Sequence, residues 1–255
     1  MQKSEPILQE RTMSDKQLRS RMIFSFALFL LLAFGAWVGY QWINHQPKED
    51  GALKPLRKVL GFNEKVFSTV FDSNKLVKEY PVSEADKKVR VNGMAGLQDS
   101  VDVNTWRLQV VRSSGDTLQL TLDNIKKLPK KDIVFDFKCI EGWNQITHWA
   151  GVPLKTFMDH YGLTSQKQLA YMGLLTPDKK YYVGIDMPSI LQPQTILCYE
   201  MNGQPLPVNQ GYPLRLIIPV KYGIKHLKCI GIMYFSNTKP PDFWAERGYD
   251  YYAGH

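Results

Sequence analysis

The sequence predicts a mixed α+β domain with mostly antiparallel strands, carried behind a single apolar helix near the N-terminus. The helix is indicated by residues 22–43, a stretch without one charged side chain. The domain is indicated by short apolar runs, broken by turn residues, that begin at Val89 and continue almost to the end of the chain. No period of about 20–50 residues repeats, so a propeller or a solenoid is not expected.

The composition indicates one well-filled domain rather than a disordered chain. Of the 255 residues, 44% are hydrophobic and 12% are aromatic, which is enough apolar side chain for a sizeable core. The formal net charge of +8 describes a mildly basic surface, and such a surface suits anionic ligands. No dense run of lysine and arginine occurs, so nucleic-acid binding is not expected.

Residues 22–43 have the length and the flanks of a membrane anchor. About 20 apolar residues cross the hydrocarbon core of a bilayer. Two tryptophans and a tyrosine gather at the C-terminal end of the run, and two arginines precede it. The positive-inside rule therefore places residues 1–21 in the cytoplasm and the rest of the chain outside it. A cleaved signal peptide is the competing interpretation, but the run is longer than a signal h-region and no A-x-A site follows it.

The chain is thus expected to divide into a cytoplasmic tail (1–21), a transmembrane anchor (22–43), a linker (44–53) and a folded domain (54–255). The linker assignment depends on its polar residues together with one proline and one glycine. The domain opens with apolar residues at helical spacing, which predicts one or two short helices.

The pair Asn63-Glu64 interrupts this helical pattern. From spacing alone, Asn63 is interpreted as the N-cap of a second helix, because asparagine is a favoured capping residue.

Strand signals dominate the rest of the chain. WRLQVV and TLQLTL are separated by Ser-Ser-Gly-Asp, which predicts a hairpin. A strand ends at Cys139, and a polar and aromatic loop is expected to follow it before a helix over VPLKTFMDHYG. Four further strands are predicted at QLAYMGLL, TILCYEM, LRLIIPV and KCIGIMYF.

Cys139 is the first candidate for chemistry. Side chains alternate along a strand, so Cys139 shares a face with Ile133, Phe135 and Phe137, and its thiol is expected to point inward. No CxxC or HExxH spacing occurs, so a zinc site is not expected. His148 could form a Cys–His pair with this thiol, although a histidine that only hydrogen-bonds its own loop is the favoured interpretation.

The other two cysteines leave two possibilities open. Cys198 and Cys229 could form a disulfide if their strands are neighbours. All three thiols could equally be reduced and buried, because free cysteine is among the most buried residue types.

The second candidate for chemistry is a cation-rich segment near the C-terminus. Arg215 lies inside the apolar run LRLIIPV, where an unpaired charge would be costly. It therefore needs an anionic partner, either a carboxylate of the fold or a bound phosphate. Lys221, Lys225 and Lys228 follow around a Tyr-Gly turn, and lysines spaced in this way can also be a solvated surface.

Two motifs resemble one family. KCIEGW with HWAGVPL, followed by GYPLRLIIPVKYGIKHLK, resembles the molybdopterin domain of the sulfite oxidase superfamily. Within the superfamily, the chain most resembles the catalytic subunits of the periplasmic methionine-sulfoxide reductases. The resemblance extends from about Leu56 to about Tyr252. The resemblance implies a sulfite-oxidase-type molybdopterin-binding fold of the α+β class. It also implies a molybdenum-molybdopterin cofactor.

The resemblance also implies roles for particular residues. Cys139 would be the catalytic residue and the thiolate ligand of molybdenum. The expected cofactor-binding residues around it are Asn63, Glu64, Gln210, Arg215, His226, Leu227 (through its backbone) and Lys228. Gln210 stands where the reductases have an asparagine. The cysteine is followed by Ile140-Glu141-Gly142-Trp143 rather than by the Gly-Asn-Arg sequence of true sulfite oxidases, so sulfite oxidation is disfavoured.

The function expected from this resemblance is that of a membrane-anchored oxidoreductase on the periplasmic side of the inner membrane. It would transfer an oxygen atom to or from a small S- or N-oxide. It would exchange electrons with a haem-containing membrane subunit or a cytochrome c. The alternative is a non-catalytic subunit with this fold, serving a membrane electron-transfer complex as scaffold or electron relay.

Overall fold

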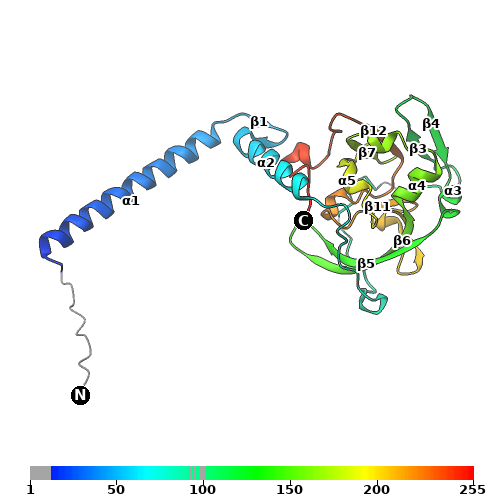
Figure 1. Ribbon diagram of the computed structural model, residues 1–255, viewed down its shortest axis with the longest axis horizontal. Helices are drawn as coiled ribbons and strands as arrows, with labels where there is room; N and C mark the ends of the chain where they lie inside the picture. Colours follow the sequence, from blue (N-terminus) through cyan, green and yellow to red (C-terminus); the bar gives the residue numbers. More distant parts are fainter. Residues whose placement is uncertain (1–12, 92, 95, 98–100) are drawn as a thin grey trace, which may run out of the picture. The chain divides into compact units, whose positions relative to one another are not determined.

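The computed structural model describes residues 13–91, 93–94, 96–97 and 101–255 (Figure 1). The chain separates into two compact units. One comprises the residues up to Pro47 together with Leu53–Pro55, and the other comprises Lys48–Ala52 and Leu56–His255.

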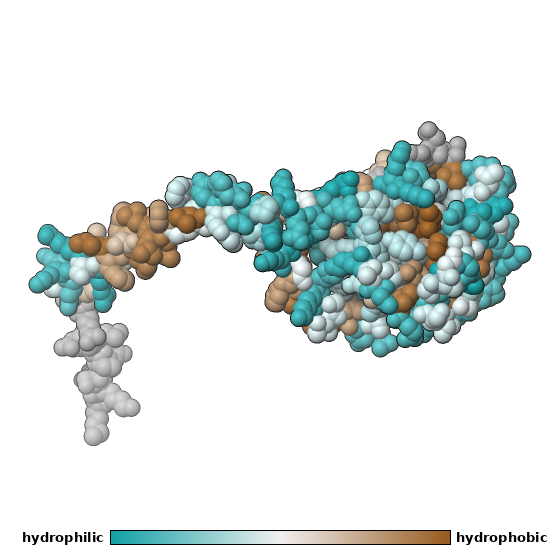
Figure 2. All heavy atoms as spheres, turned by 90° about the horizontal axis from the view of Figure 1, so that it is seen from above, coloured by the Kyte–Doolittle hydropathy of each residue, from teal (hydrophilic) through white to brown (hydrophobic). Residues whose placement is uncertain are grey.

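The first unit is essentially one long helix, α1, over Asp15–Asn44. Ser14 caps its N-terminus: the Ser14 side chain accepts from the backbone of Gln17, and the Gln17 side chain accepts from the backbone of Ser14. None of its residues is buried, and Figure 2 shows a hydrophobic band along it. By length and composition it is able to cross a membrane, as the sequence predicted for residues 22–43.

A two-stranded sheet and an exposed helix follow α1 in the chain. Strands β1 (Lys48–Glu49) and β2 (Ala52–Leu53) pair within the expected linker, and α2 follows over Lys54–Val70. The predicted N-cap at Asn63 is wrong, because α2 runs through this residue without a break. An asparagine inside a helix costs well under about 1 kcal/mol relative to alanine, and a penalty of that size does not end a helix.

One five-stranded sheet contains the strand that leads to Cys139 and the strand that begins the cation-rich segment. It contains β5 (Lys131–Lys138), β6 (Asn144–Pro153), β9 (Ile196–Met201), β10 (Gln204–Pro205) and β11 (Arg215–Ile217). All its pairings are antiparallel. The order is β10-β9-β6-β5, with β11 also paired to β9.

The loop expected after Cys139 is much shorter than predicted. A tight turn closes with the Cys139 backbone N–H donating to the Trp143 carbonyl at 2.9 Å, and Gly142 supplies a left-handed φ of 89°. Strand β6 then pairs antiparallel with β5 from Asn144 to Gly151. The polar side chains that suggested a loop belong to β6, which pairs with the strand just before it in the chain. The prediction of a long loop is therefore wrong.

The second five-stranded sheet has the order β4-β3-β12-β7-β8. Its strands are β3 (Leu108–Val111), β4 (Thr117–Leu120), β7 (Tyr171–Leu175), β8 (Tyr182–Asp186) and β12 (Ile232–Ser236). The predicted hairpin is present as β3 and β4. The central strand β12 runs parallel to β3 and antiparallel to β7, so the sheets are mixed and mostly antiparallel, as predicted.

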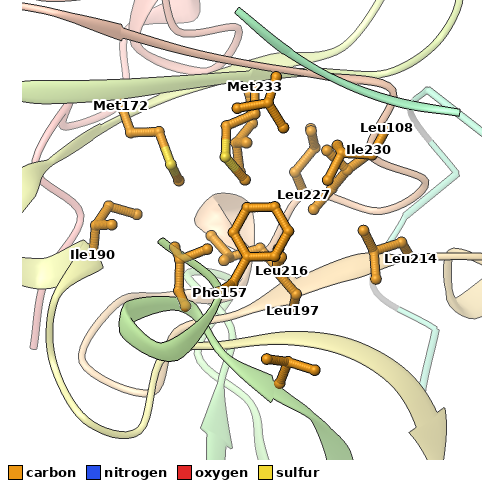
Figure 3. Close-up of a cluster of buried hydrophobic side chains, with 14 of the residues drawn as sticks. Leu108, Phe157, Met172, Ile190, Leu197, Leu214, Leu216, Leu227, Ile230 and Met233 are labelled. Carbon is orange, nitrogen blue, oxygen red and sulfur yellow. The ribbon is translucent and has the colours of Figure 1, made fainter. Parts of the chain in front are cut away.

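Short helices complete the unit: α3 (Leu122–Lys126), α4 (Leu154–His160) and α5 (Met187–Ile190). The predicted helix after Pro153 is α4. The main core gathers side chains from both sheets and from α4 and α5, and its centre is drawn in Figure 3. Leu214, just before β11, and Leu216, within it, belong to this core. Because side chains alternate, Arg215 points to the other side of the strand, where its guanidinium lies over the ring of Trp149.

Candidate active site

Cys139 follows the last residue of β5 and faces a pocket. Its side chain is 6% exposed, on the same face as the buried Phe135 and Phe137, as alternation predicted. The pocket and the open solvent at its mouth together comprise about 620 Å³. Besides Cys139, its lining comprises Gly93, Ile140, Glu141, Tyr181, Gly223, Ile224, His226, Lys228, Trp244 and Tyr249.

The thiol of Cys139 is held in its protonated form when nothing is bound. Burial raises its pKa, and the charge of Glu141 adds to this, while Arg90 acts in the opposite direction. A thiol of this kind is a poor free nucleophile at neutral pH. A metal that binds it must displace its proton, which couples binding to pH.

His226 lies on the wall of the same pocket, directly after the Gly223–Lys225 turn. Its Nδ1 lies 3.5 Å from the backbone N–H of Ile218, and its Nε2 lies 3.1 Å from the carbonyl of Lys221. Burial, and after it the charge of Arg215, lower the pKa of His226 to about 3. The ring is therefore neutral, and these contacts assign the proton to Nε2.

Lys228 brings a buried ammonium group to the pocket. Its Nζ donates to the carbonyls of Gly93 (2.8 Å) and Asn209 (3.0 Å). Burial, and after it the charge of Arg215, lower the pKa of Lys228 to about 7. Within the described residues this ammonium group forms no ion pair with a carboxylate.

Arg215 is the most costly of these cations, because it is 0% exposed. Its Nη1 donates to the carbonyl and to the side-chain Oε1 of Gln210, both at 2.9 Å. Its Nε and Nη2 have no hydrogen-bond partner within the described part of the chain. Burial lowers the pKa of Arg215 to about 10. Gln210 in turn donates from Nε2 to the carbonyls of Val89 and Arg90, so it holds Arg215 in place.

The lysines of the cation-rich segment differ in their partners. Lys221 forms an ion pair with Asp186 at 2.7 Å, and Lys225 forms one with Asp242 at 2.5 Å. Both lysines are buried, and both are neutralised by the fold. Lys228 is the lysine of the three that lines the pocket and lacks such a carboxylate among the residues described.

Of the predicted site residues, Cys139, His226 and Lys228 line the pocket. Gln210 and Arg215 instead line a separate small void with Trp143 and Trp149. Leu227 has its side chain in the core, and its N–H and carbonyl bond Lys225 and Leu216 respectively. Asn63 is exposed on α2, and the carboxylate of Glu64 on the same helix pairs with Lys239 at 2.6 Å.

The alternative Cys–His pair does not form. His148 lies opposite Val134 in the β5–β6 register, and its Nε2 is 2.8 Å from Asp132. The histidine that shares the pocket with Cys139 is His226. All three cysteines are free and buried, which resolves the question left open for Cys198 and Cys229.

Sequence reasoning missed the aromatic wall of the pocket. Tyr181, Trp244 and Tyr249 line it, and the Tyr181 hydroxyl donates to the carbonyl of Ile224 at 3.0 Å. At the mouth, Trp143 donates to Glu141 at 3.0 Å, and Arg90 lies over its ring. The aromatic-rich sequence FWAERGYDYY near the C-terminus was the available signal.

Comparison with known proteins agrees with this geometry. Residues 95–244 match the family described as "Oxidoreductase molybdopterin binding domain". The chain belongs to this family. The resemblance to the sulfite oxidase superfamily is thereby confirmed, together with the α+β fold class and the molybdenum-cofactor-dependent oxidoreductase class.

Two curated relatives carry reductase names. YedZ1 of Azospira oryzae, named as a protein-methionine-sulfoxide reductase subunit, is 35% identical over 76% of this chain and 73% of its own length. The protein-methionine-sulfoxide reductase catalytic subunit MsrP of Xanthomonas campestris is 28% identical over 58% of this chain and 50% of its own length. The chain thus spans about half the length of this second relative.

One solved structure also aligns with the chain. The sulfane dehydrogenase SoxCD from Paracoccus pantotrophus aligns with a TM-score of 0.49 at 16% identity, over 55% of this chain and 40% of that chain. A likeness at this level says nothing about substrate.

The residues of the pocket fit the cofactor that the family binds. Cys139 offers the soft thiolate donor that redox metals such as molybdenum accept. On the pocket lining, Lys228 is a cation without a carboxylate among the described residues, and outside the lining Arg215 leaves two buried N–H groups without partners there. An anionic phosphate group is the partner that would offset both charges.

The depressed pKa of Lys228 predicts how the stability of the cofactor-free protein depends on pH. The pKa of Lys228 is about 7 in the folded chain, against the ordinary lysine value of 10.5. The unfolded chain therefore binds more protons between these values. The free energy of unfolding should rise from pH 7 to pH 9, by at most about 1.4 kcal/mol per pH unit from this group.

Chemical unfolding at several pH values checks this. Lys221, whose pKa is lowered to about 8, contributes in the same direction, so Lys228→Met should reduce the rise rather than remove it. A rise of equal size in Lys228→Met and in the unaltered chain would contradict the assignment.

Proposed function

We propose that this chain is a membrane-anchored oxidoreductase that reduces a small S-oxide of the methionine-sulfoxide class. The proposal depends on one observation: an inward-facing thiol, Cys139, shares a pocket with a buried cation that no carboxylate of the described residues neutralises. The names of the relatives support the substrate class, since both are named for methionine-sulfoxide reduction.

In this proposal Cys139 is the thiolate that holds molybdenum, and it is the catalytic residue. Arg215 and Lys228 bind the phosphate of the pterin, His226 lies beside it as a neutral ring, and Gln210 positions Arg215. When bound, the cofactor supplies two-electron transfer of an oxygen atom. Asn63, Glu64 and the backbone of Leu227 remain proposed cofactor contacts from the family resemblance, and their observed positions do not place them on the pocket lining.

The pocket walls suit a sulfur-containing substrate. Tyr181, Trp244 and Tyr249 offer ring surfaces to a thioether or sulfoxide side chain, because sulfur packs favourably against aromatic rings. They also exclude water from the face of Cys139. Cys139 is followed by Ile140-Glu141-Gly142-Trp143 and not by the Gly-Asn-Arg sequence of sulfite oxidases, so sulfite is not the proposed substrate.

The proposed setting is the periplasmic face of the inner membrane. Residues 22–43 would span the bilayer, with the tail 1–21 in the cytoplasm, residues 44–53 as the connection and the domain over 54–255 outside. Electrons would come from a haem-containing membrane protein or a cytochrome c. Reduction of one sulfoxide consumes two electrons and two protons and releases a thioether and water, so the donor must deliver both electrons for each turnover.

Turnover of methionine sulfoxide tests the proposal. Detergent-solubilised full-length protein from molybdate-supplemented cells should oxidise a reduced viologen dye when methionine sulfoxide is added. Protein from tungstate-grown cells should not. Sulfite with an electron-accepting dye serves as the control substrate and should give no turnover. Equal turnover with and without molybdenum, or turnover of sulfite in place of the sulfoxide, would contradict the proposal.

A further inference from the structure

Helix α2 packs on the domain through its polar side. The Arg57 guanidinium donates to the carbonyl of Tyr249 at 3.0 Å and to that of Ala245 at 2.5 Å. About two turns further along, Glu64 pairs with Lys239 at 2.6 Å. Arg57 also donates to the carbonyls of Glu49 and Asp50, in the turn that precedes the helix.

The apolar side of α2 is exposed along most of its length, and its C-terminal residues Phe67 and Val70 also line a groove with Val220 and Tyr252 of the domain. Its large apolar residues are exposed, up to 66% for Phe62 and 71% for Val70. At about 100° per residue, they fall within an arc of about 140°. The members of this apolar face are Leu56, Val59, Phe62, Val66, Phe67 and Val70.

This orientation is the reverse of that expected for a surface helix of a soluble domain. Such a helix turns its apolar stripe toward the core and its charged face toward water. A contiguous apolar face left in water marks a surface that something covers. No residue of α2 is buried, so the described part of the domain leaves Leu56, Val59, Phe62 and Val66 exposed and only borders Phe67 and Val70.

The short connection between the apolar run and the domain indicates that a membrane is the surface available to α2. Lys48 follows Ile43, the last residue of the apolar run, by five positions, and five residues reach at most about 18 Å. The turn at Gly51 is fixed on the domain, because a Cβ there would lie 2.6 Å from the carbonyl carbon of Arg247. Only a short length of chain therefore connects the apolar run to the part of the turn that is fixed on the domain.

The lysines beside the apolar face also favour a membrane surface. Lys58 and Lys65 border the apolar face of α2 and are exposed. Neither forms an ion pair within the described residues. Lysines at this position extend toward lipid headgroups while their methylene groups cover apolar surface. A helix with an apolar face, bordering lysines and low overall hydrophobicity is the kind that lies in a membrane interface.

We propose that α2 lies on the lipid bilayer with the apolar face inserted at the headgroup level. This inference depends on the proposed anchoring of residues 22–43. Its consequence concerns the active site. Arg57 binds the carbonyl of Tyr249, and Tyr249 lines the pocket of Cys139. Docking of α2 would hold one wall of the pocket at a fixed height above the membrane, within reach of a membrane-embedded electron donor.

Lipid-borne quenching of site-specific probes tests the proposal on the full chain. The native cysteines are buried, so an environment-sensitive fluorophore would label an introduced exposed cysteine selectively. Val59→Cys and Val66→Cys lie on the apolar face. Ser68→Cys, nearly opposite on the helix, is the matched control. Labelled protein is reconstituted in vesicles of phosphatidylcholine and phosphatidylglycerol, with and without brominated acyl chains. Ala33→Cys, in the middle of α1, reports on the anchor.

The proposal predicts strong quenching at Val59→Cys and Val66→Cys, and little at Ser68→Cys. Equal signals at the three α2 positions, with Ala33→Cys quenched, would overturn the docking of α2 and leave the anchor intact. An unquenched Ala33→Cys would instead refute the anchor itself. If the probes on the apolar face become shielded only after a membrane protein partner is added, the face belongs to that partner and the lipid proposal is wrong.

Discussion

Replacing Lys225 by methionine should destabilise the domain by about 3–5 kcal/mol, because it leaves the carboxylate of Asp242 buried without its cation. Lys225 and Asp242 are both almost fully enclosed, at 1% and 2% side-chain exposure. The ammonium group also donates to the carbonyl of Gly184 at 2.9 Å and lies over the ring of Tyr251. Chemical unfolding of the cofactor-free protein measures the loss.

Lys228→Met is the matched control for this prediction, three residues further along the chain. It removes a buried ammonium group that has no carboxylate partner in the described structure, so no buried anion is left behind. Its cost in unfolding free energy should be far smaller than that of Lys225→Met. A second variant, Asp242→Asn combined with Lys225→Met, should recover part of the loss. Equal losses in the two lysine variants would contradict the division between fold cations and site cations.

Replacing Arg215 by methionine should abolish cofactor retention without weakening the cofactor-free protein. The guanidinium is fully buried and has two N–H groups without partners in the described chain, so the folded apoprotein bears its desolvation cost. Methionine has comparable volume and can pack against the ring of Trp149, on which Arg215 now lies. The lost hydrogen bonds to Gln210 offset part of the gain.

The measurement pairs thermal unfolding of the cofactor-free protein with molybdenum content after expression with molybdate. We expect an unchanged or higher melting temperature for Arg215→Met and little bound molybdenum. A fall in melting temperature as large as that of Lys225→Met, with molybdenum retained, would show that Arg215 serves the fold rather than the cofactor.

Local patterns in the sequence were enough to predict several elements. The β3–β4 hairpin follows from two alternating runs around Ser-Ser-Gly-Asp, and α4 follows from its helical spacing and Pro153. The inward direction of Cys139 follows from strand alternation alone. Each of these depends on residues within a few positions of one another, where period and turn chemistry act directly.

Elements that depend on distant partners were beyond the sequence. Strand β6 looks like a loop because its polar residues carry no alternation, and its pairing with β5 and β9 makes it a strand. The continuity of α2 through Asn63 was missed because an asparagine is both a frequent cap and a tolerable interior residue.

The roles of the site residues also depend on partners that are distant in the sequence. Three lysines in one segment look alike in sequence, and only the carboxylates of Asp186 and Asp242 distinguish Lys221 and Lys225 from Lys228. The burial of Arg215 followed from its place in an apolar strand, where a charge is costly. Its anionic partner stays a prediction: within the described residues Arg215 hydrogen-bonds only to Gln210, and the phosphate is a proposal.

Molybdenum content of the purified full-length protein tests the central claim most directly. The account predicts near-stoichiometric molybdenum in the unaltered chain and its loss in Cys139→Ser, since a serine hydroxyl lacks the soft thiolate donor. Cys198→Ser, at another buried thiol, controls for the general effect of removing a cysteine and should retain the metal. Active protein without molybdenum, or molybdenum retained in Cys139→Ser at the level of Cys198→Ser, would contradict it.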